Sequence, residues 1–330
     1  MGPDQPPAPD EPPDRKDLAR QVSKRFFLPV ALRELLPGLE AARATFSPPY
    51  SDLADVFARN LTSVISTLGI PVTLASAAAE GSHWQRIHIA ERIRALMIFA
   101  EGEEDETAVE ARRSENAHKS ALEKMKEFSG SDEGRDQMAA DSCRFLLTSL
   151  DSEDMVSAAG ELLLQGEVLI WSALESLARD LFEAILNADP KRILPILRDP
   201  TAKHRLPSRF TVEELASFGF DVSRSFGSVL SSYQDFSDIR TIRALLQSAL
   251  NSDATVEAAL ADRRLWMLCQ RRHLIVHRRG VVDLRYIEAT GDKALQGSRL
   301  SVVPSDLEAD FQAVGLAGTA LLVSAQTHAA

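Results

Sequence analysis

The stretch Arg271-Arg272-His273-Leu274-Ile275-Val276-His277-Arg278-Arg279-Gly280-Val281-Val282-Asp283 joins a helical apolar pattern to a concentration of basic side chains. Seven arginines lie between Arg263 and Arg285 against one acid, although the whole chain has a formal net charge of -11. Imidazole exchanges protons near neutral pH, and a planar guanidinium can hold a phosphate through two parallel hydrogen bonds. The stretch therefore predicts a site for phosphodiester chemistry, with RNA cleavage as the sharpest hypothesis.

The remainder of the chain has the composition of an ordinary soluble, mainly helical protein. Its 330 residues can bury at least one full core and suggest two units, since domains commonly hold roughly 100 to 200 residues. Hydrophobic residues make up 45% and aromatic residues 6%, and the abundant Ala, Leu and Glu favour helices. Because general nucleic-acid coating needs many basic groups, the net negative charge indicates that any RNA contact is local.

No part of the sequence predicts export or a membrane anchor. Residues 1–17 are rich in proline and acids, without an apolar core, and are interpreted as a disordered tail. The longest uncharged stretch, residues 311–330, contains glycines, glutamines and hydroxyl side chains, which favours a buried terminal helix over a membrane span. Cys143 and Cys269 lie far apart without a CxxC spacing, so neither a disulfide framework nor a zinc knuckle is implied. We expect a cytoplasmic protein that has no membrane partner.

A strongly charged segment, from Glu101 to Gln137, divides the chain. Both a solvated helix flanked by loops and a linker between two units fit its composition. We place a boundary near residue 135, which gives an N-terminal, mostly helical region at 18–135 that ends in the charged linker, and a helical domain at 136–330. Within the first region, residues 84–97 predict an amphipathic helix. Its apolar face would consist of Ile89, Ile93, Leu96 and Met97.

The second domain predicts several helices and one short extended pair. A long helix from Met155 to Asn187 ends before Asp189-Pro190, and a motif helix runs from Thr255 to about Arg279, where Gly280 stops it. Two short β-branched runs, residues 281–287 and 300–303, allow a small β-hairpin. Further helices are predicted at residues 237–250, after the capping box Thr211-Val212-Glu213-Glu214, and after a second capping box, Ser305-Asp306-Leu307-Glu308.

Within the motif helix, His273 and His277 are four residues apart and share a face, and the long stem of Arg272 can fold back toward a phosphate held by an imidazole. The spacing Arg272-His273-Leu274-Ile275-Val276-His277 resembles the Arg-x4-His signature of the HEPN superfamily (higher eukaryote and prokaryote nucleotide-binding domains). The trailing segment Gly280–Tyr286 is similar to the family as well, and the long helix, with Trp171-Ser172-Ala173-Leu174-Glu175-Ser176-Leu177, looks like its first core helix. The resemblance covers roughly residues 140 to 325. It implies an all-α fold with a C-terminal helical bundle of HEPN type, in which the long helix packs against the motif helix.

The resemblance also implies a function. Many members of the family are metal-independent RNases that act as dimers, and others only bind. A homodimeric endoribonuclease is implied, which acts on RNA without a cofactor and leaves 2′,3′-cyclic phosphate ends. Its biological role would be that of a toxin or antiviral effector, with an antitoxin or regulatory protein as a further partner.

Residue roles follow from the same resemblance. His277 would act as general base or acid, and Arg272 would stabilise the charge that grows on the phosphorane-like transition state. His273 would orient the phosphate or serve as the second proton carrier. By the family pattern, Glu175 would orient an imidazole or a guanidinium from the neighbouring helix. Additional phosphate binding is expected from Arg271, Arg278 and Arg279.

Other interpretations of the same residues stay open. The site could belong to a non-catalytic module that binds nucleotides or RNA or serves as a scaffold, and Arg278 and Arg279 could merely complement the helix dipole. His273 and His277 have zinc-ligand spacing, but Leu274 stands where the His-Glu-x-x-His motif has its glutamate, and no third ligand is evident.

A second motif is set aside. Phe226-Gly227-Ser228, followed by Ser237-Asp238-Ile239-Arg240, is similar to the Gly-Ser and Asp-x-Asp pattern of small nucleotidyltransferases. Arg240 replaces the second metal-binding aspartate, and the segment predicts helix where that family needs a strand. We therefore expect no metal.

Overall fold

The structure is a computed structural model that describes residues 15–98 and 105–329. Over these residues the fold is all-α, as predicted, with 17 α-helices, 76% helical content and no strand. Residue contacts divide the chain into two compact units, the first comprising residues 1–26 and 69–158 and the second residues 27–68 and 159–330.

These units divide the chain differently from the predicted boundary near residue 135. Residues 27–68 belong to the second unit because helix α4 (Tyr50–Leu68) buries its apolar face there, with Phe57 and Leu61 at 1% exposure or less. A local pattern reveals that a helix has an apolar face but not which part of the chain covers it. Of the predicted disordered tail, residues 1–14 lie outside the described residues, and residues 15–17 open helix α1.

The first unit is a helical cluster in which α5 packs against α6 and α7, and α1 packs against α7. Of the two interpretations of the charged segment, a helix or a linker, the structure shows the helix: most of the segment is α6, because Val109, Ala117, Ala121 and Met125 give it one apolar face, which is buried. Asp105 caps this helix by accepting a hydrogen bond from the Ala108 N–H at 2.7 Å. Residues 99–104 of that segment lie outside the described residues. The helices of this unit are α1 (Arg15–Val22), α5 (Ile70–Ala95), α6 (Glu106–Gly130) and α7 (Asp132–Ser149).

Two buried polar side chains tie α5 to its neighbours. Glu91 is 5% exposed and accepts hydrogen bonds from Lys124 Nζ at 2.6 Å and Ser120 Oγ at 2.8 Å, and these donors lower the pKa of its carboxyl to about 2. His83, also buried, forms a hydrogen bond of 2.9 Å with Asp141 of α7. Polar pairs of this kind fix the register of packed helices.

The predicted amphipathic helix at residues 84–97 lies mainly within α5, but its apolar face is not the buried one. Ile89, Ile93 and Leu96 are 58%, 62% and 59% exposed. The buried face of α5 is formed instead by small and polar residues, namely Ala75, Ala79, His83, Glu91 and Ala95.

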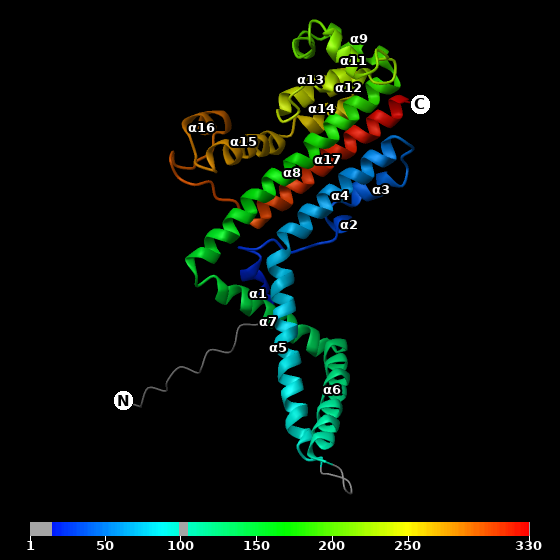
Figure 1. Cartoon of the computed structure of the whole chain (residues 1–330). Helices are drawn as coiled ribbons and strands as arrows, with labels where there is room; N and C mark the ends of the chain where they lie inside the picture. The colour runs from blue at the N-terminus through cyan, green and yellow to red at the C-terminus, as the bar shows by residue number, and fades with distance from the viewer. Residues whose placement is uncertain (1–14, 99–104, 330) are drawn as a thin grey trace, which may run out of the picture. The chain divides into compact units, whose positions relative to one another are not determined.

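The second unit is organised around three long helices, α4, α8 (Glu153–Ala188) and α17 (Pro304–Ala329), which run side by side (Figure 1). Glycines allow this close approach. A Cβ atom added at Gly166 of α8 would lie 2.8 Å from Leu68, and one added at Gly318 of α17 would lie 2.4 Å from Phe57. The predicted long helix and the predicted buried terminal helix are thus confirmed.

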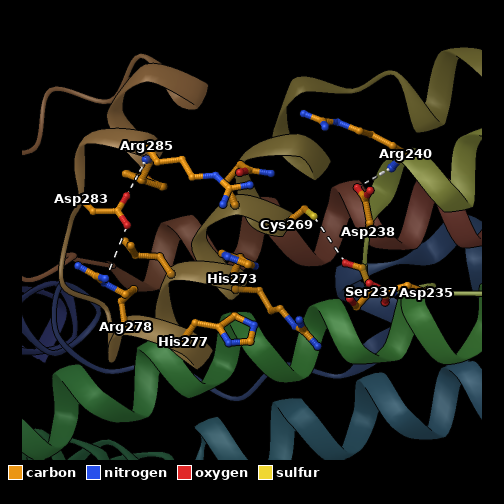
Figure 2. Close-up of a pocket in the computed structure, with 14 residues that line it drawn as sticks. Asp235, Ser237, Asp238, Arg240, Cys269, His273, His277, Arg278, Asp283 and Arg285 are labelled. Carbon is orange, nitrogen blue, oxygen red and sulfur yellow. Dashed lines mark hydrogen bonds and ion pairs between the residues drawn. The ribbon is translucent and has the colours of Figure 1, made fainter.

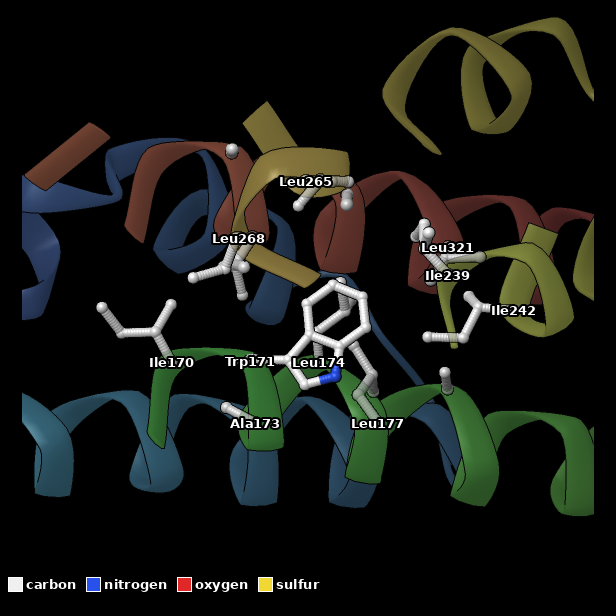
Figure 3. Packing of buried hydrophobic residues seen from close by; sticks show 14 of the residues in the cluster. Ile170, Trp171, Ala173, Leu174, Leu177, Ile239, Ile242, Leu265, Leu268 and Leu321 are labelled. Carbon is white, nitrogen blue, oxygen red and sulfur yellow. The ribbon is translucent and has the colours of Figure 1, made fainter. Parts of the chain in front are cut away.

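Shorter helices cover this trio and form the rest of the core. Trp171 of α8 is fully buried in a cluster with Leu265 and Leu268 of α15 and Ile242 of α13 (Figure 3). Replacing such a residue by alanine typically lowers stability by about 3 to 5 kcal/mol. The shorter elements are α2 (Leu32–Leu35), α3 (Pro37–Arg43), a 3-10 turn (Pro190–Arg192), α9 (Ile193–Arg198), α10 (Pro200–Lys203), α11 (Val212–Ser217), α12 (Phe226–Ser231), α13 (Ile239–Ala249), α14 (Ala254–Leu260), α15 (Arg263–Arg278) and α16 (Leu284–Thr290).

The expected β-hairpin does not form. Among the described residues, the only β pairing is an isolated antiparallel bridge between Val281 and Arg299. The β-branched run after Val281 is overridden because Asp283 caps α16, accepting a hydrogen bond from the Tyr286 N–H at 2.8 Å.

Helix boundaries agree with the sequence in part. The capping box at the start of α11 forms with both hydrogen bonds, from Glu214 N to Thr211 Oγ1 at 3.2 Å and from Thr211 N to Glu214 Oε2 at 2.7 Å. The motif helix, predicted as one piece, is divided into α14 and α15 because Asp262 starts a new helix. The terminal helix begins at Pro304, ahead of the expected capping box.

No single helix within the described ranges is long and apolar enough to span a membrane, although α4 and α5 meet that test when they are taken together as a bent pair.

Candidate functional site

Helix α15 presents the motif on a firmly placed backbone. The Asp262 side chain caps its start by accepting a hydrogen bond from the Arg264 N–H at 2.7 Å. At the other end Arg279 and Gly280 adopt left-handed conformations with φ of 52° and 74°, and the Gly280 N–H donates to the Leu274 carbonyl at 3.2 Å. The predicted stop at Gly280 is therefore confirmed.

A cleft of about 440 Å³ lies beside the polar face of α15 (Figure 2). Four of the seven residues predicted for the site line it, and all four come from α15: Arg272, His273, His277 and Arg278. The structure thus brings the central residues of the motif together in one solvent-open space.

The two histidines contact each other within the cleft. The ring centroids of His273 and His277 are 4.5 Å apart, and both residues are exposed. Partial loss of water lowers the pKa of His273, and the charges of His277 and Arg285 lower it further. The His273 ring therefore stays neutral to a lower pH than a free imidazole and is available as a proton acceptor.

Arg272 is held at the cleft wall by the long helix. Its Nη2 atom lies 3.6 Å from Glu175 Oε2, and Glu175 also accepts a hydrogen bond of 3.3 Å from Arg179. The Arg272 side chain is 19% exposed. Glu175 does not line the cleft, but the structure places it where it can orient the guanidinium of Arg272.

Arg271 faces the interior and does not line the cleft, so the structure does not bring it together with the other residues predicted to bind phosphate. Its Nη1 atom donates to Glu167 Oε1 at 2.8 Å, and the Glu167 side chain is fully buried. Burial raises the pKa of Glu167 to about 8. The pKa of Arg271 is raised in spite of its own burial, because the Glu167 carboxylate and the Tyr286 hydroxyl stabilise its charge.

The two arginines at the end of the helix have different positions. Arg278 lines the cleft, is 58% exposed, and has its Nε atom 3.9 Å from Asp283 Oδ2. Arg279 is exposed and forms the left-handed end of α15, outside the cleft. Of the three arginines predicted to add phosphate binding, Arg278 alone lines the cleft.

The other walls of the cleft carry side chains that the motif did not predict. Arg240 and Asp238 come from the start of α13, where Asp238 caps the helix by accepting from the Arg240 N–H at 3.0 Å. The Arg240 guanidinium lies over the Trp266 ring, 4.9 Å from its centroid. In the sequence, Arg240 is distinguished only as the residue that stands in place of a metal-binding aspartate.

A second unpredicted wall comes from α16, with Arg285 and Tyr286. The Tyr286 hydroxyl donates to Asp292 Oδ2 at 2.7 Å, and burial raises its pKa to about 12. The sequence signal for Arg285 was its place in the run of seven arginines, directly after the motif.

Over the described ranges, no group of three or more His, Cys, Asp or Glu side chains is arranged to hold a metal ion. Cys143 and Cys269 are free thiols, and burial raises the pKa of Cys269 to about 11. Phe226, Gly227 and Ser228 lie in α12, where Gly227 packs against the backbone of Glu183, whereas Ser237 and Asp238 lie in the turn before α13.

No protein-family model matches the chain, and neither does any curated protein or solved structure. The resemblance to the HEPN superfamily therefore rests on the motif residues and on their placement in an all-α fold.

Proposed function

We propose that this protein is a metal-independent endoribonuclease of HEPN type that cleaves RNA to 2′,3′-cyclic phosphate ends. The observation that carries the proposal is the convergence of Arg272, His273 and His277 on one open cleft. An imidazole sealed in the core could not meet a substrate, and neither of these two rings is sealed. We include in the proposal a cytoplasmic role as toxin or antiviral effector, under the control of an antitoxin or regulatory protein.

The chemistry needs two proton transfers. The ribose 2′-oxygen attacks the adjacent phosphorus while the bond from phosphorus to the 5′-oxygen breaks. The 2′-hydroxyl proton passes to a neutral imidazole, and the departing 5′-oxygen takes a proton from an imidazolium. His277 suits either transfer, and His273, whose pKa is lowered from that of a free imidazole by partial burial and nearby charges, suits proton acceptance or orientation of the phosphate. Arg272 donates to the non-bridging oxygens on which negative charge grows.

The placement of the two imidazoles favours a homodimer. In-line displacement puts the attacking and leaving oxygens on opposite sides of the phosphorus. His273 and His277 share one helix face with their rings in contact, so they reach a bound phosphate from the same side. Cys269 and Tyr286, which also line the cleft, keep their protons near neutral pH because burial raises their pKa to about 11 and about 12.

A second copy facing the first would supply the opposite imidazole. Apolar side chains near the end of α15 are exposed and would be covered in such a dimer. They are Val276, Val281 and Leu284, which are 49%, 40% and 53% exposed.

The test is cleavage of a labelled single-stranded RNA by the full chain in the presence of a metal chelator. We expect His277→Ala or Arg272→Ala to lower kcat/KM by about 10² to 10⁴-fold, the range for lost acid–base or electrostatic catalysis. His204→Ala and Arg279→Ala are matched controls, since both residues are exposed outside the cleft, and they should retain activity. Circular dichroism melting checks that each variant is folded. Full activity in both cleft variants would contradict the proposal.

One observation favours a second function, binding of nucleotides or RNA without cleavage. Arg272 and Arg278 each have a carboxylate nearby, Glu175 at 3.6 Å and Asp283 at 3.9 Å. These carboxylates partly neutralise the positive charge that would stabilise a transition state. A binding module would bind RNA with steep salt dependence and leave every RNA intact.

A further inference from the structure

The cleft holds two arginines that differ from those of the motif in their partners. Arg272 and Arg278 lie near Glu175 and Asp283. In the part of the chain that the structure describes, no carboxylate lies within 4.0 Å of the guanidinium of Arg240 or Arg285, although both residues are exposed and line the cleft. An unpaired guanidinium keeps its N–H donors available for a phosphate.

Arg240 is held in place without being neutralised. Its guanidinium lies 4.9 Å from the centroid of the Trp266 ring, a cation–π contact that fixes the position of the charge and leaves its edge free. The charge acts inside the cleft: burial raises the pKa of Cys269, and the charges of Arg272 and Arg240 oppose that rise. Arg240 is therefore a fixed cation on the α13 wall.

Arg285 stands on the α16 wall, and the motif helix lies between the two walls (Figure 2). Partial loss of water and the charge of His277 lower the pKa of His273, and Arg285 contributes to the same shift. This cation therefore acts on the ring that is proposed to meet the scissile phosphate. Two unpaired cations from different elements thus line the same cleft as the histidine pair.

The acids of these walls are already used by the backbone. Asp238 accepts from the Arg240 N–H, and Asp283 accepts from the Tyr286 N–H, so both carboxylates cap helices. As carboxylates, they disfavour a phosphate that lies close to them. An anionic chain is therefore favoured at the points where the unpaired arginines stand.

We propose that the cleft binds a single RNA strand through one phosphate on each side of the scissile phosphate, with one flanking phosphate at Arg240 and the other at Arg285. The position of the scissile phosphate, at His273 and His277, rests on the proposed function. The substrate class is an oligonucleotide that extends past the cleaved bond in both directions, and not a mononucleotide or dinucleotide.

The experiment measures binding of a 2′-O-methyl RNA tetranucleotide, which cannot be cleaved, to the full-length protein by fluorescence anisotropy. Two further probes carry a neutral methylphosphonate in place of the first or the last internucleotide phosphate. We expect each neutral replacement to raise the Kd of the wild type about tenfold, the effect of one lost charge-assisted hydrogen bond. Arg240→Gln should raise the Kd of the unmodified probe by a similar factor. In this variant a methylphosphonate at one end of the probe should cause no further rise in Kd. Arg285→Gln should show the same pattern for the methylphosphonate at the other end.

Arg279→Gln is the matched control, because Arg279 is an exposed arginine of the same segment outside the cleft, and it should bind like the wild type. The proposed strand path, with the flanking phosphates at Arg240 and Arg285, is overturned if the wild type does not bind the probe, or if neither methylphosphonate changes its Kd. If that happens while the wild type still cleaves RNA, this inference fails and the enzyme proposal stands. If the expected end-specific pattern appears but unmodified RNA stays intact, the enzyme proposal fails and the strand path stands.

Discussion

Two adjacent arginines of α15 have opposite surroundings, and the contrast explains how one basic stretch serves two purposes. Arg271 is 12% exposed and pairs with the fully buried Glu167, whereas Arg272 lines the cleft beside Glu175. Successive residues of a helix are about 100° apart, so one side chain points into the core and the next toward the cleft. A high density of basic residues in a sequence therefore overstates the size of a site.

The core side of α15 is a buried charge network and not a spare binding surface. Besides the Arg271–Glu167 pair, it contains Arg264 and the fully buried Asp310, which form an ion pair. Burial raises the pKa of Asp310 to about 6. Buried ion pairs add little stability compared with apolar packing, but breaking one by removing a single partner is strongly destabilising.

The largest expected effect separates the two arginines by stability. Above pH 8, where Glu167 is ionised, Arg271→Ala leaves the buried Glu167 carboxylate without its partner, so we expect the free energy of unfolding to fall by about 3 to 5 kcal/mol. Arg272→Ala should lower it by only about 1 kcal/mol, because its partner Glu175 keeps the contact with Arg179. Urea unfolding followed by circular dichroism measures both. If both variants lost the same unfolding free energy, the contrast between a core-facing Arg271 and a cleft-facing Arg272 would be contradicted.

The next prediction asks whether charge as such is needed on the core side. Replacing both partners, Glu167→Leu with Arg271→Met, removes the buried charges and keeps a similar volume. We expect the double variant to recover most of the stability that Arg271→Ala loses, to within about 1 to 2 kcal/mol of the wild type. A double variant as unstable as the single one would indicate that the network stabilises the fold through its charges.

A third prediction concerns pH. Because burial raises the pKa of Glu167 from 4.5 to about 8, the folded protein holds this proton more tightly than the unfolded chain. The contribution of this proton to the free energy of unfolding is complete below about pH 4.5 and is lost as pH rises toward 8. Relative to Glu167→Gln, the unfolding free energy of the wild type should fall over this range, by at most about 1.4 kcal/mol per pH unit. Parallel pH profiles for the two proteins would refute the assignment.

The smallest effect belongs to the cleft side. Partial loss of water and nearby cations, including Arg285, lower the pKa of His273, so NMR titration of its ring should give a midpoint below 6.5. Arg285→Ala removes one of these cations and should move the midpoint upward by a fraction of a pH unit. A midpoint that stays where it was, or moves downward, would place Arg285 away from the ring.

The long helices were predictable because their sequence signals are local. The apolar period from Met155 onward and the stop at Pro190 define α8 to within two residues at its start and one at its end. The sharing of one cleft by His273 and His277 was predictable as well, because residues four apart on a helix must lie on one face. These parts need no knowledge of the tertiary fold.

The remaining features depend on contacts between distant segments. Nothing local distinguishes Arg271, which pairs with Glu167 more than one hundred positions earlier in the chain, from Arg272. The same holds for Arg240, which the fold brings to the cleft from another helix. The β propensity of the residues that follow Gly280 allowed a hairpin, but the hairpin does not form because Asp283 caps a helix there.

The central claim is that an imidazole and a guanidinium on the open face of α15 break an RNA backbone by using the 2′-hydroxyl beside the scissile phosphate. The most direct measurement compares an all-ribose oligonucleotide with one that has a single 2′-deoxy residue at the mapped cleavage position, both with chelator present. The account predicts 2′,3′-cyclic phosphate and 5′-hydroxyl ends from the first substrate and an intact bond in the second, with neither product formed by His277→Ala. Cleavage at the deoxy position, or products that carry 5′-phosphate ends, would contradict it.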